Sequence, residues 1–347
     1  MKYAFLGSFL LLFTTVSVQA LASDDRDLDN EVERTGLAVD ADEIFWKFIH
    51  GEDNIEYTDV VKKLTKAIEK DPQDTYAKAH LGWTKFWSFT EGLVRGLTDG
   101  RQAVQNMQAA ENAYASAAAL APDEPRILGF LGYTRIALGG TTANADLLMQ
   151  GQEDVVRSIE LWPEWAYFGA AYALSANAPY GSPPFDQAVN FFFVNMDVCA
   201  NTAIDRNNPD LAPFMALETQ TGRDRACWDS WIAPYNAEGF FLIMGDALVK
   251  AGKTDVAAVL YNNAKLMEYY SDWPYRDLLE RRIENIQENV TNFRQSPAFN
   301  QPVDVETTMI VNTGISCAIC HQGDADEHYE QPDWIGEHAN HYPVPAF

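Results

Sequence analysis

Helix ends that recur along the chain set the strongest limit on its fold. Apolar residues three and four positions apart predict helices, and three of these helices stop at a proline, at Pro72, Pro122 and Pro163. Ten residues beyond each proline stands a small residue with apolar neighbours, namely Gly82, Gly132 and Ala173. A small side chain at such a position lets the following helix approach its partner closely. The pattern therefore predicts repeated helix pairs.

The helical spacing continues over most of the chain, and no long segment shows the two-residue alternation of a strand. It begins with apolar residues at positions 44, 45, 48 and 49, and a last amphipathic helix carries Leu279, Ile283, Ile286 and Val290. We therefore predict an all-α fold. Composition marks three loops inserted between helices, at residues 139–144, 177–186 and 201–213.

A fourth unit contains more of a known repeat pattern. Five positions between residues 245 and 264 carry it: Gly245, Gly252, Ala257, Tyr261 and Ala264. With this unit, residues 55–290 resemble the tetratricopeptide repeat (TPR) family. The resemblance implies an array of antiparallel helix pairs, with Gly245 and Ala257 at helix contacts, Gly252 in the turn and Tyr261 as a packing aromatic. The three prolines lie 50 and 41 residues apart instead of thirty-four, and inserted loops account for the difference.

The amino-terminal sequence predicts export. Lys2 is followed by an apolar run over residues 5–18, and Ala20 and Ala22 supply small residues for cleavage. The run is shorter than the roughly twenty residues that span a bilayer, and no other run reaches that length. The mature chain is thus expected to be periplasmic or secreted, with no membrane span after signal cleavage. We predict four segments: a signal peptide at 1–22, an acidic flexible arm at 23–42, a TPR-like helical domain at 43–296 and a C-terminal segment at 297–347.

The segment Cys317-Ala318-Ile319-Cys320-His321 carries the chemistry. In an exported chain, two cysteines three positions apart and followed directly by a histidine match the attachment motif of haem c. The thiols add to the two vinyl groups of the haem, and the adjacent imidazole binds the iron. We predict one covalent haem c, held by Cys317, Cys320 and His321, with His321 as the proximal iron ligand. Because the C-terminal segment is too short to enclose a porphyrin alone, it should pack on the helical domain.

Several residues remain candidates for the distal iron ligand. No methionine follows the motif, so the imidazole and thioether pair of small c-type cytochromes is not expected. His338 and His341 lie far enough along the chain to reach the other face of the haem. His328 is only seven residues from His321 and reaches it with difficulty, and Met309 is a lesser candidate. The remaining histidines are expected on the surface or hydrogen-bonded in the core: His50 and His80.

Two other interpretations use the same residues. A redox disulfide would join Cys317 to Cys320, and a zinc ion would take both thiols together with His338 and His341. Neither interpretation gives His321 a role, and haem attachment explains all three residues of the motif. No serine–histidine–aspartate set and no phosphate-binding glycine loop is present, so we predict no catalytic residues.

Aromatic side chains gather on predicted helical faces. They either fill the core between helices or line the concave side of the array as a binding surface. One face carries Trp83, Phe86 and Trp87, and another carries Trp162, Trp165, Phe168 and Tyr172.

Cys199 and Cys227 are the two cysteines outside the motif. In an oxidising compartment we expect them to form a disulfide. Closing a loop of about 29 residues would stabilise the fold by roughly 3 to 4 kcal/mol, because it limits the unfolded chain.

The formal charge of −25 bears on the partners of the chain. It argues against nucleic acid. It favours either a solvated surface that repels other copies of the chain or a redox partner protein with a basic docking surface. We therefore expect an exported monohaem c-type cytochrome that transfers single electrons. One alternative is a TPR-like module that binds a protein or solute, with haem in a structural or sensing role. The other is a haem enzyme with an open iron site, since the chain resembles the cytochromes c-prime in the C-terminal position of its motif.

Overall fold

Helices make up nearly all regular structure in the chain. The computed structural model describes residues 34–51, 55–94, 100–295 and 303–332. These residues contain no strand and one isolated β-bridge, so the predicted all-α fold is confirmed. The first eight helices are α1 (Gly36–His50), α2 (Tyr57–Lys70), α3 (Thr75–Val94), α4 (Gly100–Ala118), α5 (Pro125–Thr142), α6 (Ala145–Leu161), α7 (Pro163–Asn177) and α8 (Pro183–Cys199). The later ones are α9 (Asn236–Ala251), α10 (Thr254–Asn263), α11 (Arg276–Glu284), α12 (Ile286–Phe293), α13 (Ala318–His321) and α14 (Ala325–His328).

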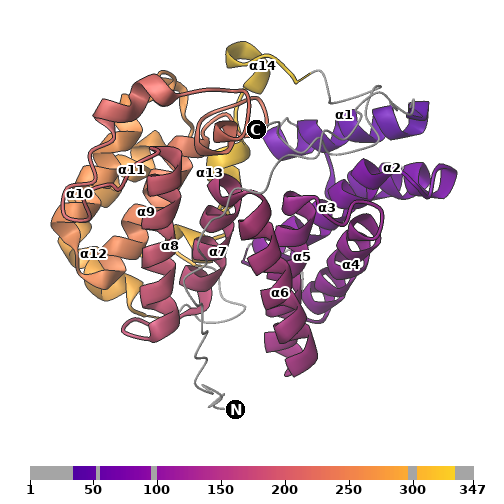
Figure 1. Cartoon of the computed structure of the whole chain (residues 1–347), viewed down its shortest axis with the longest axis horizontal. Coiled ribbons are helices and arrows are strands. Elements are labelled where there is room, and N and C mark those ends of the chain that lie inside the picture. Colours follow the sequence, from indigo (N-terminus) through magenta and orange to yellow (C-terminus); the bar gives the residue numbers. More distant parts are fainter. Residues whose placement is uncertain (1–33, 52–54, 95–99, 296–302, 333–347) are drawn as a thin grey trace.

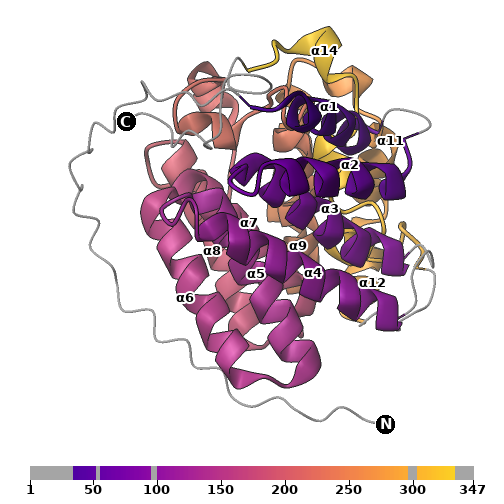
Figure 2. The ribbon, with the colours of Figure 1, turned by 90° about the vertical axis from the view of Figure 1, so that its right-hand side faces the viewer.

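Helices that are neighbours in the chain pack in pairs: α1 with α2, α3 with α4, α5 with α6, α7 with α8, and α9 with α10. Figure 2 shows α1 to α4 stacked in chain order. A Cβ atom added to Gly82 would lie 2.9 Å from the ring of Tyr114 in α4, and one added to Gly132 would lie 2.7 Å from the carbonyl oxygen of Gly151 in α6. These small residues therefore stand where paired helices touch, as the repeat pattern predicts.

The helical array begins earlier than the sequence indicated. The flexible arm predicted at 23–42 is wrong from residue 34 onward, because α1 starts at Gly36 with Thr35 as its N-cap. Residues 23–33 lie outside the described residues. The acidic composition was misleading because apolar residues of α1, Ala38 among them, pack into the core, so this part of the segment is not a solvated arm.

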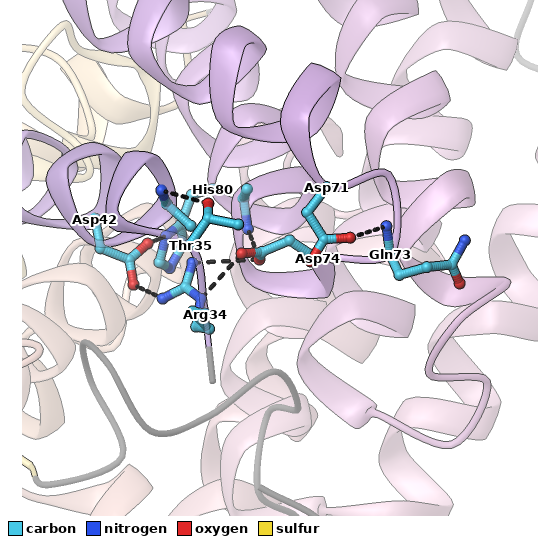
Figure 3. Close-up of polar contacts among 9 residues, drawn as sticks. Arg34, Thr35, Asp42, Asp71, Gln73, Asp74 and His80 are labelled. Atoms are coloured by element: carbon cyan, nitrogen blue, oxygen red, sulfur yellow. Dashed lines mark hydrogen bonds and ion pairs between the residues drawn. The ribbon is translucent and has the colours of Figure 1, made fainter. Parts of the chain in front are cut away.

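A buried network of charges compensates the acidic residues of α1 (Figure 3). The Arg34 guanidinium donates hydrogen bonds to Asp42 and also to both carboxylate oxygens of Asp74, at 3.0 and 3.2 Å. His80 Nδ1 lies 2.8 Å from the other Asp42 oxygen. All four side chains are buried. The network joins the chain before α1 to α1 itself, to the residue that precedes α3 and to the second turn of α3.

The C-terminal segment folds back onto the array. Helix α13 contacts α9 and α1, and the 3-10 helix η5 (Ile310–Asn312) contacts α7 and α9. Figure 1 shows α13 between the first helices and the last ones. Ile319 and Cys320 pack in the core around α9, whereas Ala318 packs in the core around α1. The segment thus shares both cores with residues 43–296.

Cys199 and Cys227 form a disulfide, with Cα atoms 5.8 Å apart. It joins the end of α8 to the 3-10 helix η2 (Asp224–Cys227), within the long connection that leads to α9. The disulfide therefore anchors a segment that would otherwise be held only by its contacts.

No helix in the described part of the chain has both the length and the apolar character needed to cross a membrane. The predicted signal peptide at 1–22 lies outside the described residues.

Candidate functional site

The cysteine–histidine motif occupies the short helix α13, and neighbouring segments hold its backbone. Cys317 is the N-cap of this helix, and Cys320 is buried. The Trp273 indole N–H donates to the carbonyl of Ile319 at 2.8 Å, and the Tyr235 N–H donates to the carbonyl of Cys320 at 3.1 Å. The motif is therefore fixed against the body of the protein and does not lie on a free tail.

A cavity of about 780 Å³ lies inside the array, against this motif. Its size falls in the range of pockets that bury a whole cofactor or drug-sized ligand. Helices α3, α5 and α7, the connection before α9 and the C-terminal segment supply its walls. Aromatic residues of the two predicted faces line it: Trp83, Phe86, Trp162, Trp165, Phe168 and Tyr172. These residues line the cavity and also pack against the cores, so they combine the two predicted roles in position, while Trp87 is a buried core residue.

All three residues of the motif line this cavity. Cys317, Cys320 and His321 come from one turn of helix, so they approach the space from the same side. A haem bound here would find two thiols that can form thioether bonds and one imidazole that can bind its iron. The side chains present thus fit a covalently bound haem: two thiols, one imidazole and an aromatic lining.

One hydrogen bond orients the His321 ring. Its Nδ1–H donates to the carbonyl of Ile232 at 2.9 Å, which leaves Nε2 as the nitrogen available to a metal. Burial lowers the pKa of His321 to about 4, so the ring is neutral at neutral pH. Trp83 packs against it edge-on, with ring centroids 5.1 Å apart. A neutral, oriented imidazole is the form that binds iron.

The sulfur of Cys320 sits in a space that a glycine provides. A Cβ atom added to Gly239, in the first turn of α9, would overlap Cys320 Sγ. Burial raises the pKa of the Cys320 thiol well above its ordinary value, so the free residue is a neutral thiol. Helix α9 therefore fixes where this sulfur lies relative to the cavity.

Two guanidinium groups line the cavity beside one indole. Arg126, in the first turn of α5, and Arg225, in η2, lie over the Trp162 ring, with Cζ atoms 5.5 and 5.1 Å from its centroid. Arg126 also pairs with Glu124. Burial, and then the charge of Arg126, lower the pKa of Arg225 to about 10. The charge of Arg126 is thus partly compensated by Glu124, and the forked donors of both guanidinium groups suit a carboxylate.

The candidates for the distal ligand lie in different places. His338 and His341 lie outside the described residues. His328 stacks on Tyr269, with ring centroids 3.9 Å apart, and Met309 is buried in the core around α9. Neither His328 nor Met309 is among the residues that line the cavity. Within the described residues, neither of these two side chains therefore lies in the cavity wall beside the motif.

His80 and His50 were predicted on the surface or hydrogen-bonded in the core, and both are buried. His80 also lines the cavity, while its Nδ1 faces Asp42. Its position three and six residues before Trp83 and Phe86 is a helical spacing that could have indicated this. His50 packs edge-on against Trp231, and its carbonyl accepts a hydrogen bond from the Gly323 N–H just beyond the motif.

Other metal sites find no support in the described residues. There, no group of three or more His, Cys, Asp or Glu side chains is arranged to hold a metal ion. The zinc hypothesis needs His338 and His341, which lie outside the described residues, so it remains a hypothesis.

Comparison with known proteins gives no relative: no family model matches the chain, and no curated protein or solved structure matches it. The function therefore has to be argued from the cavity and the motif themselves.

Proposed function

We propose that this protein is an exported monohaem c-type cytochrome that transfers single electrons. The observation that carries the proposal is the convergence of Cys317, Cys320 and His321 on one side of an aromatic cavity of about 780 Å³. A bound haem would supply a one-electron redox centre, with its potential set by the axial ligands and the surroundings.

Different residues of this chain would bind different parts of such a group. Cys317 and Cys320 form the thioether bonds, and His321 binds the iron through Nε2 while Ile232 holds its other nitrogen. Arg126 and Arg225, which line the cavity beside Trp162, would bind the carboxylates of the haem. The aromatic lining would limit the access of water to the bound group, which influences its redox potential.

The scaffold in this proposal is TPR-like. Gly252 ends α9 with a φ of +79°, and a Cβ atom added to Gly245 would overlap the ring of Tyr261 in α10. These are the turn and contact roles that the resemblance implies. Location outside the cytoplasm is supported by the disulfide between Cys199 and Cys227, because such bonds persist in oxidising compartments.

The redox partner stays part of the proposal. The chain has 50 acidic and 25 basic residues, so a basic docking surface on the partner would be attracted at low ionic strength. For the distal ligand we keep His338 and His341, and the proposal does not depend on which of them binds.

The test is maturation of the full chain in cells that carry the haem-attachment machinery. Mass spectrometry of the product should find one added haem, and the variant Cys317→Ser/Cys320→Ser should have none. The reduced protein should show a low-spin spectrum that carbon monoxide leaves unchanged. A wild-type chain without added haem, or with Cys317 bonded to Cys320, would refute the proposal.

A second candidate is a haem protein with an open iron site that binds a small ligand or reduces peroxide. One observation favours it: no methionine is among the described residues that line the cavity. A high-spin spectrum that changes on addition of carbon monoxide would select this candidate. The variant His338→Ala/His341→Ala separates the two, since it should convert an electron carrier into such a site.

A further inference from the structure

Two acidic side chains with no part in the proposed haem binding lie buried behind the motif. Asp229 is 1 % exposed and Glu238 is 0 % exposed. Asp229 Oδ1 accepts a hydrogen bond from the Ala237 N–H at 2.8 Å. Among the described residues, no other group donates a hydrogen bond to the carboxyl oxygens of Glu238, and its carboxyl group is close enough to that of Asp229 for the two to share a hydrogen bond when one of them holds a proton. A buried carboxylate in this state is costly, and a proton removes the cost.

The pair lies next to the motif. Glu238 directly precedes Gly239, whose missing side chain makes room for Cys320 Sγ. The Tyr235 N–H, on the same stretch of chain, donates to the carbonyl of Cys320. Both carboxyl groups are close enough to Cys320 to raise the pKa of its thiol. A charge at the proposed haem would therefore act on this pair across the interior of the protein, where screening is weak.

The surroundings favour protonation of both groups. Burial raises the pKa of Asp229 to about 7, and burial followed by the charge of Asp229 raises the pKa of Glu238 well above its ordinary value. The other titratable groups that act on the pair are acidic or neutral: Glu218 from the connection after η1, Tyr235 from the segment before α9, and Cys320 and Tyr329 from the C-terminal segment. The pair is thus poised between one and two protons near neutral pH.

We infer that Asp229 and Glu238 form a proton-binding site that is coupled to the electron carried by the haem. When a donor protein delivers one electron to the site, one proton from water binds the pair and forms an O–H bond on a carboxylate. On oxidation, the electron passes to an acceptor protein and the proton returns to water. Atoms and charges balance in each direction, and the inference rests on the proposed function. It adds that the protein carries hydrogen in the form of one electron and one proton.

The sign of the pH dependence follows from this coupling. The added electron makes the interior more negative and raises the proton affinity of the pair. The reduction potential falls as the pH rises through the window around the pKa of Asp229, because reduction takes up a proton and the proton concentration decreases. Well below this window both carboxyl groups hold protons in either redox state, and the reduction potential no longer depends on pH.

The experiment is a redox titration of the matured full chain at several pH values from about 5 to about 9. The absorption spectrum of the protein measures the ratio of reduced to oxidised form. At a fixed ambient potential, the ratio of reduced to oxidised wild-type protein should fall by up to about tenfold per pH unit near neutrality. The variant Asp229→Asn removes the group that titrates in this window, and its amide oxygen can still accept the Ala237 hydrogen bond, so it should lose most of this dependence and keep its haem. Glu218→Gln alters an exposed neighbouring carboxylate, and it should shift the profile slightly without removing it.

Infrared difference spectroscopy of the wild type tests the site without a variant. Reduction should increase the absorption of a protonated carboxyl group, and this band should shift in heavy water. If haem is attached but the potential is independent of pH and no such band appears, the inference fails and the cytochrome stands. If mass spectrometry finds no haem on the wild-type chain, the cytochrome fails and the inference fails with it.

Discussion

The sulfur of Cys320 has its place only because residue 239 has no side chain. We expect Gly239→Ala to push this sulfur away from the cavity, since the added methyl overlaps it. Overpacking of this kind costs about 1 to 3 kcal/mol. The fraction of matured protein with both thioether bonds should fall, and mass spectrometry of haem peptides measures it.

Gly36→Ala is the matched control for that substitution. Gly36 is also in the first turn of a helix, and a Cβ atom there meets nothing within 4 Å. Its free energy of unfolding should change by less than about 0.5 kcal/mol. If Gly239→Ala attached haem as completely as this control, Gly239 would have no part in setting the sulfur position.

The buried charge network makes a second prediction at the scale of residues. Asp42→Asn should lower the free energy of unfolding at neutral pH by about 3 to 5 kcal/mol, because it leaves a buried cation with one carboxylate fewer. Burial by itself would raise the pKa of Asp42, but the charges of His80 and Arg34 outweigh it and bring the pKa below its ordinary value. The charged form is therefore the stable one in the fold.

The pH dependence of this effect follows from the lowered pKa. The contribution of Asp42 is complete above the ordinary carboxyl pKa of about 3.9 and is lost as the pH falls through the lower value in the fold. The difference between wild type and Asp42→Asn in urea unfolding should stay constant above about pH 5 and shrink below about pH 4. Glu43→Gln, at the exposed neighbouring position, should change stability by less than about 1 kcal/mol. Equal effects of the two substitutions would contradict this account.

At the scale of elements, the close contact between α5 and α6 tests the repeat pattern. Gly132→Ala would place a methyl group 2.7 Å from the Gly151 carbonyl oxygen in α6, so α5 and α6 would have to move apart. We expect a loss of about 1 to 3 kcal/mol in the free energy of unfolding. Gly140→Ala, in the same helix but in open space, should be neutral or stabilise by up to about 1 kcal/mol. Thermal unfolding of both variants measures the difference. If Gly132→Ala were as stable as the wild type, Gly132 would not be needed for the packing of α5 on α6.

The helices could be predicted where apolar spacing and a proline indicated the same boundary. A boundary was mispredicted where a glycine had two possible roles. Apolar spacing and proline stops indicated the helix pairs. The glycines at 139 and 140 indicated a loop at 139–144, but α5 continues to Thr142. Gly139 serves a close contact instead, since a Cβ atom there would lie 2.9 Å from the Asn144 carbonyl oxygen. Sequence alone does not separate a glycine that ends a helix from one that lets two helices meet.

At the scale of the whole molecule, the motif was readable from five adjacent residues, but its surroundings were not. Ile232, which orients His321, lies 89 residues before it in the chain, and Arg126 lies farther still. No local pattern connects such residues, because they meet only when the C-terminal segment closes against the array. The aromatic faces indicated that a concave surface could exist. Its contact with the motif is a property of the folded chain.

An occupant of the cavity should stabilise the C-terminal segment against local opening. The walls of the cavity belong both to the array and to residues 303–332, so an occupant would contact both. Without one, side chains on each wall lose contact partners across the gap. Amide hydrogens of residues 303–332 should exchange at least about tenfold faster in the unmatured chain than in the haem-bound protein, a difference of about 1.4 kcal/mol in local opening. Helices α10 to α12 supply no lining residue and should exchange equally in both forms. Equal exchange of residues 303–332 in the two forms would mean that the segment closes the cavity without help from its contents.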